Sequence, residues 1–250
     1  MYFDVPVPCF FGGQDFCEAL RKIKACGFDA VETYDWKGLD RPRVKAVLDE
    51  LQMQLVSICT SEFRLTDAAY RDAFLAGVEE SIAAAKELGV TKMITQVGPD
   101  TGAPRDLQHR NIVVTLRMAA PLLEKSGITL MIEPLNALYD HKGYFLTTSA
   151  EAADIVKEVH SENVKIIFDI YHQQATEGNI LNNIQAYLPW IAHIHAAGHP
   201  GRHELQEGEN DYRLIFDRLQ KMGYEGAVGL EYGPLMPPEE SLAAFRRIYL

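Results

Sequence analysis

Four acidic or basic side chains near the ends of short apolar runs are the residues of this sequence best placed to do chemistry. Glu133 lies in ITLMIEPLN, Asp169 in VKIIFDIYH, His195 in IAHIHAAG and Glu231 in AVGLEYG. All four belong to the residue types that bind metal ions. Three carboxylates at one point repel one another and cannot all stay ionised without a compensating cation. If the four side chains converge, they therefore predict a divalent metal site.

The residue types also indicate which metal and which reaction to expect. A ligand set rich in carboxylates, with one imidazole, suits Mn²⁺, Mg²⁺ or Co²⁺ better than a thiolate-bound zinc ion. Such an ion would hold a hydroxy-carbonyl substrate through two oxygens and acidify the adjacent C–H bond. Glu133 or Glu231 would act as the base on one face of the substrate, and the other would return a proton.

Each of these residues taken alone has a simpler interpretation. Glu133 or Asp169 could cap the loop that follows its strand, and a lone histidine in a strand is more often an interior residue than a ligand. His193 lies two residues before His195 and on the same strand face. The prediction depends on the joint occurrence of four such residues at matching strand ends.

Two further residues are expected near this site. His172 comes three residues after Asp169, where the strand has ended, and could form a hydrogen bond with a substrate oxygen. Arg202, in the loop AGHPGRHEL, could stabilise an enediolate or bind a carboxylate, and the alternative is a solvated loop charge. The neighbouring His203, Glu204 and Glu207 are expected to serve loop structure.

Aromatic side chains follow the first two predicted strands. Phe10, Phe11, Tyr34 and Trp36 could form the wall of a pocket, because ligand sites usually have apolar walls. Plain packing is the commoner role of such a cluster, so we leave them out of the predicted site.

The elements that must position these residues alternate between strand and helix along the whole chain. The four runs read as buried strands, rich in β-branched and aliphatic residues without a helical period. The first strand is expected in MYFDVPVPCF, and eight strand–helix pairs follow in all. Such alternation predicts parallel strands, and functional residues at their carboxyl ends favour a (β/α)₈ TIM barrel. An open doubly wound sheet is the alternative, but no Gly-rich phosphate loop follows the first strand.

Composition limits the class of protein. A chain of 250 residues without a composition shift predicts one barrel domain spanning 1–250. The net charge of −11 argues against a nucleic-acid partner. The sequence has no run of 18 apolar residues, so we expect no membrane span. The N-terminus does not look like a signal peptide. Four cysteines in the first quarter of the chain, without a CxxC pair, are expected to be free thiols in the cytoplasm.

Several segments of the second half resemble the hydroxypyruvate isomerase family, within the xylose isomerase-like TIM barrels. They are IEPLN, YFLT, FDIYHQQATEG, HIHAAGHPGRHE, GEND-Y and GLEY. The resemblance implies an isomerase of 2-oxo-3-hydroxy acids that works through an enediol between Glu133 and Glu231. It also implies metal ligation by Glu133, Asp169, His195 and Glu231, and substrate contacts from His172 and Arg202.

Two positions depart from the pattern of the family. Where this chain has His195, typical hydroxypyruvate isomerases have a glutamine in the pattern HLQ, and a histidine there resembles the ketose 3-epimerases. The third strand, SICTSEF, lacks the histidine that both groups usually place near the substrate.

These departures leave several functions open. A ketose 3-epimerase is the main alternative, and an inosose dehydratase-like lyase shares the barrel and the ligands. An endonuclease IV-like enzyme would need a histidine-rich zinc cluster and a basic groove. A non-catalytic barrel that binds a sugar or serves as a scaffold is the alternative outside enzymes. The expected partner is a small sugar or hydroxy-oxo acid, and the resemblance suggests a homo-oligomer.

Overall fold

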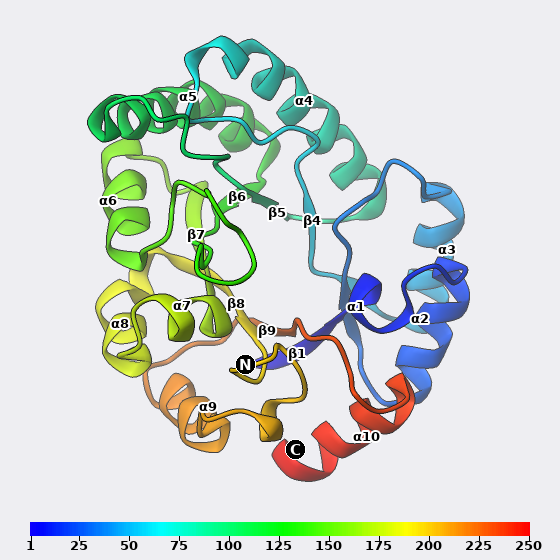
Figure 1. Cartoon of the computed structure of the whole chain (residues 1–250). Coiled ribbons are helices and arrows are strands. Elements are labelled where there is room, and N and C mark those ends of the chain that lie inside the picture. The colour runs from blue at the N-terminus through cyan, green and yellow to red at the C-terminus, as the bar shows by residue number, and fades with distance from the viewer.

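The computed structural model describes residues 1–250 as a ring of short parallel strands surrounded by helices (Figure 1). Except for β3, which continues into β4, each strand is followed by at least one helix before the next strand begins. The strands are β1 (Tyr2–Pro6), β2 (Ala30–Glu32), β3 (Gln54–Leu55), β4 (Ser57–Cys59), β5 (Lys92–Thr95), β6 (Thr129–Ile132), β7 (Val164–Asp169), β8 (Ile191–Ala196) and β9 (Ala227–Leu230).

The strand order shows that the sheet closes on itself. Neighbours are paired in the order β3-β2-β1-β9-β8-β7-β6-β5-β4, and every pairing is parallel. β3 and β4 are two pieces of one strand, because only Val56 separates them, and its N–H donates to the carbonyl of Val31 in β2. The two ends of the row are thus continuous, which confirms the eight-stranded TIM barrel predicted from the sequence.

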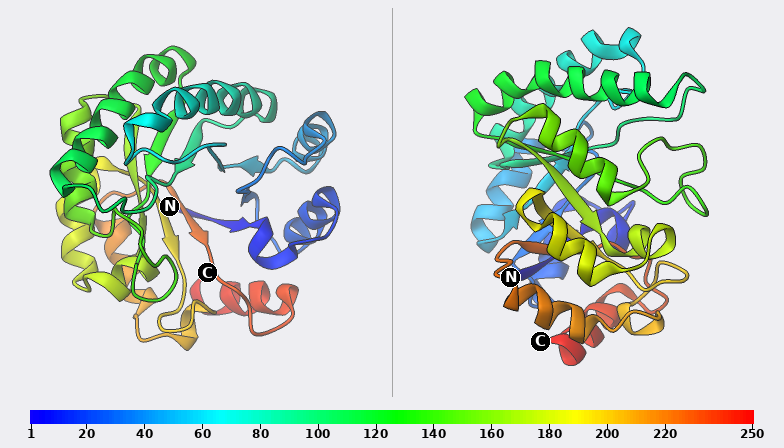
Figure 2. Two further views of the ribbon diagram at one scale, coloured as in Figure 1. Left: turned by 45° about the horizontal axis from the view of Figure 1, so that its top comes forward. Right: turned by 90° about the vertical axis from the view of Figure 1, so that its left-hand side faces the viewer.

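Ten α-helices cover the outside of this barrel (Figure 2). They are α1 (Val7–Phe11), α2 (Phe16–Ala25), α3 (Arg41–Leu51), α4 (Arg71–Leu88), α5 (Arg105–Ser126), α6 (Ser149–Val159), α7 (Ile170–Thr176), α8 (Ile180–Tyr187), α9 (Tyr212–Lys221) and α10 (Pro238–Tyr249). Short 3₁₀ turns lie at Ala68–Tyr70, Leu188–Trp190 and Leu205–Glu207. None of the helices combines the length and apolarity that a membrane crossing requires.

Local chemistry explains where several helices begin and end. The side chains of Asp15, Thr148 and Asp211 cap α2, α6 and α9 by accepting a backbone N–H three residues further on. α4 and α5 end at Gly89 and Gly127, which adopt the left-handed conformation that glycine allows without strain. The apolar faces between these ends pack on the barrel and form one continuous core from Val5 in β1 to Phe245 in α10.

The first predicted strand is shorter in the structure than in the sequence-based prediction. β1 stops at Pro6, and Val7–Phe11 form the short helix α1 instead of continuing the strand. Pro8 explains the change, because proline suits the first turn of a helix, where its missing N–H needs no partner.

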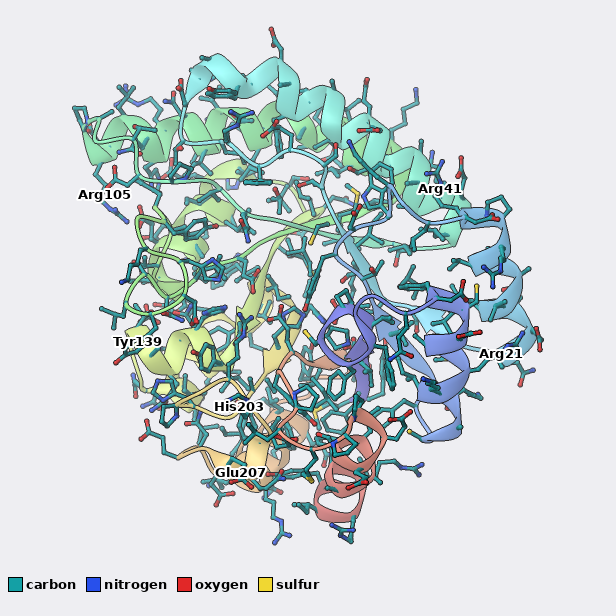
Figure 3. All side chains as sticks on the ribbon, turned by 45° about the vertical axis from the view of Figure 1, so that its right-hand side comes forward. Arg21, Arg41, Arg105, Tyr139, His203 and Glu207 are labelled. Atoms are coloured by element: carbon teal, nitrogen blue, oxygen red, sulfur yellow. The ribbon has the colours of Figure 1, made fainter.

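Charged side chains on the outer helices form ion pairs between neighbouring helices. Figure 3 shows Arg21, Arg41 and Arg105 at the periphery of the molecule. They pair with Glu50, Glu87 and Glu151, respectively, which link α2 to α3, α3 to α4 and α5 to α6. Such solvent-exposed pairs contribute about 0–1 kcal/mol each. The outer helices therefore depend for stability mainly on their buried faces.

Candidate active site

The four predicted metal ligands lie at one end of four neighbouring strands. Glu133 directly follows β6, Asp169 ends β7, His195 is the last residue but one of β8, and Glu231 directly follows β9. Because these strands are parallel neighbours, their carboxyl ends share one face of the barrel. His195 Nδ1 lies 3.1 Å from Glu231 Oε2 and 3.8 Å from Glu133 Oε1. Oxygens of Glu133, Asp169 and Glu231 and a ring nitrogen of His172 lie within 4.8 Å of one another. A ring nitrogen of His195 lies within the same distance of Glu32 and His193.

Buried atoms of three of the four predicted ligands lack hydrogen-bond partners, and this fits a cation site. Glu133 Oε1, Asp169 Oδ2 and His195 Nδ1 are buried and have no hydrogen-bond partner. Buried polar atoms are nearly always paired, so unpaired carboxylate oxygens around one point call for a positive charge between them. Burial opposes a charge on His195, but Glu231 and Glu32 raise its pKa well above the usual value, so its ring carries part of that charge when no metal ion is bound. A divalent ion bound by carboxylate oxygens and one imidazole nitrogen would satisfy all of these unpaired atoms.

His172 also points its Nε2 atom at this cluster, but its neighbours make it a hydrogen-bond donor. Asn136 Oδ1 accepts from the backbone N–H groups of Tyr139 and Asp140, which fixes the orientation of the amide. Asn136 Nδ2, 2.7 Å from His172 Nδ1, must then donate to that ring nitrogen. Burial lowers the pKa of His172 to about 3, so the ring is neutral and carries its one proton on Nε2, facing the site.

Arg202 reaches the site from the loop after β8. Its Nη2 atom donates to Glu231 Oε2 at 2.6 Å and lies 3.8 Å from Asp169 Oδ2. The backbone of Arg202 is left-handed, and hydrogen bonds to Gly198 and Gly233 hold it there. Burial opposes the charge, but Glu231 and Asp169 outweigh burial and raise the pKa of the guanidinium. Arg202 is therefore part of the cluster rather than a solvated loop charge.

The two glutamates of the site differ in their tendency to hold a proton. Burial, together with the nearby charge of Glu231, raises the pKa of Glu133 to about 8. For Glu231, burial also opposes ionisation, but His195 and Arg202 hold its pKa well below the usual value. Pairs of acids whose surroundings move their pKa values apart are typical of sites with one proton donor and one proton acceptor.

A cavity of about 580 Å³ opens over these residues. Glu133, His172, His195, Arg202 and Glu231 all contribute to its wall. A larger cavity of about 770 Å³ lies at the opposite end of the barrel, between the start of β1 and the C-terminal residue Leu250. The smaller cavity is the better candidate for the site, because only there do acids and histidines converge.

Comparisons with known proteins agree with this architecture. A model of the family described as xylose isomerase-like TIM barrel matches residues 20–248. The chain belongs to this family. The hydroxypyruvate isomerase of Escherichia coli K12 is 32% identical over 252 residues, which cover 96% of each chain. The 2-oxo-tetronate isomerase of Cupriavidus necator is 40% identical over 119 residues, 48% of this chain and 45% of that one.

The fold of this xylose isomerase-like barrel also matches solved structures. A structure described as AP endonuclease, family 2, from Brucella melitensis superposes with a TM-score of 0.94 at 27% identity, over 100% of this chain and 99% of that chain. The resemblance to hydroxypyruvate isomerases seen in the sequence is confirmed by relatives that span nearly the whole chain. The protein is accordingly an isomerase.

Sequence reasoning missed Tyr34, which had been set aside as packing. Its hydroxyl group donates to Glu231 Oε1 at 2.6 Å and lies 3.4 Å from Cys9 Sγ. Tyr34 also lines the cavity, as does Trp36, whereas Phe10 and Phe11 are buried in the core. A polar tip on an aromatic residue directly after a barrel strand was the feature that could have identified it.

His203 and Glu204, in the same loop after β8, have the structural roles expected for them. Figure 3 labels His203 and Glu207 in this loop. His203 Nδ1 bonds to the carbonyl of Gly233, and the buried carboxylate of Glu204 accepts the backbone N–H groups of Leu235 and Met236. These bonds tie the loop that carries Arg202 to the segment that follows Glu231.

Proposed function

We propose that this isomerase interconverts a small 2-oxo-3-hydroxy acid, of the hydroxypyruvate or 2-oxo-tetronate type, with its aldehyde or 3-oxo isomer. The observation that supports the proposal is the placement of one cation, Arg202, and one neutral N–H donor, His172, beside the two glutamates Glu133 and Glu231 in one cavity. A substrate acid needs a cation, and an enediol needs a base and an acid on either side of it.

Glu133, Asp169, His195 and Glu231 are the proposed ligands of a divalent ion, Mn²⁺, Mg²⁺ or Co²⁺. When bound, the ion would polarise the substrate carbonyl and acidify the neighbouring C–H bond. Of these residues, Glu133 and Glu231 are the proposed catalytic pair, because both carry a carboxylate that lines the cavity. Asp169 and His195 are proposed to act as metal ligands only.

The proposed reaction begins when Glu231 removes a proton from the substrate. Glu231 takes a proton from the hydroxyl-bearing carbon, and the electron pair of the C–H bond moves into the new C=C bond of an enediol. Glu133, which would be ionised as a metal ligand, takes the hydroxyl proton of the enediol and delivers it to the former carbonyl carbon, and Glu231 passes its proton to the former carbonyl oxygen. His172 Nε2–H and Arg202 donate to the oxygens on which negative charge develops.

Two observations favour the alternative of a ketose 3-epimerase. His195 stands where typical hydroxypyruvate isomerases have glutamine, and the cavity of about 580 Å³ is in the range of pockets that hold ligands larger than a three-carbon acid. An endonuclease is disfavoured, because a net charge of −11 does not suit the binding of a phosphate backbone.

Proton NMR in D₂O with Mg²⁺ tests the proposal directly. The panel holds hydroxypyruvate, a 2-oxo-tetronate, fructose, tagatose and inosose, with Glu231→Gln as the control protein. We expect deuterium beside the carbonyl group of an acid substrate with wild type and no exchange with the control. Exchange only at C3 of a ketose would assign an epimerase, and loss of a hydroxyl group from inosose would assign a lyase. A folded, metal-loaded protein that exchanges no proton would contradict the proposed chemistry.

The remaining expectations from the sequence complete the proposal. Residues 1–250 form a single barrel domain, the protein works in the cytoplasm on a small molecule, and it assembles as a homo-oligomer without nucleic-acid or membrane partners. Light scattering coupled to size-exclusion chromatography measures the oligomeric state, and a monomer at micromolar concentration would contradict that part.

A further inference from the structure

A second group of acids and histidines lies inside the barrel, directly beneath His195. Its centre is Glu32, the last residue of β2, whose carboxylate is completely buried. Glu32 Oε1 lies 2.7 Å from His193 Nε2, and Oε2 accepts a hydrogen bond from the hydroxyl of Ser57. His195 Nε2 is 3.3 Å from each of the two carboxylate oxygens. Neither the predicted site nor the proposed reaction uses Glu32.

The two nitrogens of His195 therefore face different surroundings. Nε2 faces Glu32, whereas Nδ1 has no hydrogen-bond partner and faces Glu231 and Glu133. An ionised carboxylate can only accept hydrogen bonds, so the nitrogen beside Glu32 must carry a proton. Nδ1 is then the nitrogen that can bind a metal ion, which takes the place of any proton there, because histidine binds metal ions as a neutral ring.

The backbone of β9 leaves room for this contact. Gly229, two residues before Glu231, has no side chain, and a Cβ atom there would lie 2.6 Å from Glu32 Oε1, 2.7 Å from His195 Cδ2 and 2.8 Å from Asp4 Oδ1. All three distances are too short for real contacts. Any larger residue at this position would push Glu32 and His195 apart, so the glycine is required by their close approach rather than by backbone conformation.

We propose that Glu32 is a positioning residue, which accepts the Nε2–H of His195 and so keeps Nδ1 of that ring directed at the metal position. The inference depends on the metal site of the proposed function. Carboxylates that accept the second N–H of a metal-binding histidine fix the orientation of the ring and increase the basicity of the ligating nitrogen, and their loss typically weakens metal binding by about 10- to 100-fold.

His193 and Ser57 hold Glu32 in place for this role. Three donors, from His193, Ser57 and His195, converge on one carboxylate, and all four side chains are buried. Hydrogen bonds to a charged acceptor are among the stronger ones in proteins, so the carboxylate has little freedom to turn away from His195. The nearest other acid is Asp4, whose Oδ2 atom is 3.7 Å from His193 Nε2.

Glu32→Gln is the most informative variant, because it keeps the shape of the side chain. A glutamine offers only one acceptor oxygen, so its NH₂ group must face one of the three donors. Glu177→Gln is the matched control. Glu177 accepts hydrogen bonds from Ser149 and Asn183 and does not contact His195. Calorimetric titration with Mg²⁺ or Mn²⁺ measures the affinity of wild type and both variants, and circular dichroism checks that they fold.

We expect Glu32→Gln to bind the metal ion about 10- to 100-fold more weakly than wild type and Glu177→Gln to bind it equally well. A smaller loss in the same direction is expected for Ser57→Ala, which removes one support of the carboxylate. This milder variant keeps the test decisive if Glu32→Gln does not fold. Unchanged affinity in a folded Glu32→Gln protein would overturn the proposal.

NMR of histidines labelled with ¹⁵N provides a measurement on the wild-type protein without any variant or metal. We expect His195 Nε2 to carry a slowly exchanging proton both in the metal-free protein and with Mg²⁺ bound. A proton on Nδ1 alone would overturn the inference. If wild type binds no divalent ion while Nε2 is protonated, the proposed metal site fails but the orientation by Glu32 stands.

A second metal ion is the main competing explanation for the buried cluster. Glu32 and His193 are then ligands, and wild type binds two ions per chain, of which Glu32→Gln loses one. That stoichiometry, measured in the same titration, would overturn the positioning role. One ion per chain in both proteins, with the weaker affinity in Glu32→Gln, is the result that supports it.

Discussion

The raised pKa of Glu133 predicts that its replacement by glutamine changes the stability of the metal-free protein in a pH-dependent way. Burial and the charge of Glu231 raise this pKa from the ordinary value of 4.5 to about 8 in the folded protein. The folded state therefore binds the proton more tightly than the unfolded state. The proton on Glu133 thus stabilises the folded protein. This contribution to the free energy of unfolding is complete below about pH 4.5 and is lost as the pH rises through about 8.

The size of the effect follows from the two pKa values. One proton released on unfolding changes the free energy of unfolding by about 1.4 kcal/mol per pH unit. Between about pH 5 and pH 8 the wild-type protein should therefore lose stability relative to Glu133→Gln with this slope, and the difference should level off above pH 8. The total approaches about 5 kcal/mol, an order-of-magnitude figure for a fully buried carboxyl group.

Urea unfolding of both proteins in EDTA, from pH 5 to pH 9, measures this difference. Subtracting the two curves removes the titration of groups that do not interact with Glu133, including His172, whose lowered pKa acts in the opposite direction. Glu177→Gln is the control for removing a carboxylate outside the site. Saturating Mg²⁺ should abolish the slope, because a bound cation favours the ionised form at every pH.

A difference between Glu133→Gln and wild type that stays constant from pH 5 to pH 9 would refute the reasoning. It would mean that Glu133 is ionised in the folded protein even without a metal ion. In that case, burial and the charge of Glu231 would not control the protonation of Glu133.

Three further variants test other contacts of the site. Glu231→Gln should reduce kcat by at least about 10²-fold with an unchanged circular dichroism spectrum, because it removes the base. Arg202→Ala should raise KM for an acid substrate more than for a neutral ketose, and an equal rise for both would exclude a carboxylate-binding role. Tyr34→Phe removes the hydrogen bond to Glu231 Oε1. One such bond to a charged group contributes about 1.5–3 kcal/mol, so kcat should fall by about 10- to 100-fold with little change in KM.

The sequence predicted the barrel and the convergence of its late strands because both depend on short-range patterns. Runs such as VKIIFD read as buried strands from their composition alone, and a polar residue at the end of each run marked the functional face. Parallel pairing then brought Glu133, Asp169, His195 and Glu231 together. Their roles in metal binding and catalysis stay predictions.

The contacts that the sequence did not reveal are long-range. Glu32 lies 163 positions before His195, and Tyr34 lies 197 positions before Glu231, so no local pattern connects them. The order of the strands in the closed barrel decides these contacts. Glu32 had one recognisable feature, a carboxylate at the end of a buried strand, but it was read only as part of that strand.

The raised pKa of Glu133 has a consequence for the uptake of the proposed metal ion. A carboxylate binds a metal ion only in its ionised form, so Glu133 must release its proton when the ion enters the site. Below about pH 8, the ion therefore competes with this proton for the same carboxylate. The empty site is thus expected to take up its metal ion more readily in mildly alkaline than in acidic solution.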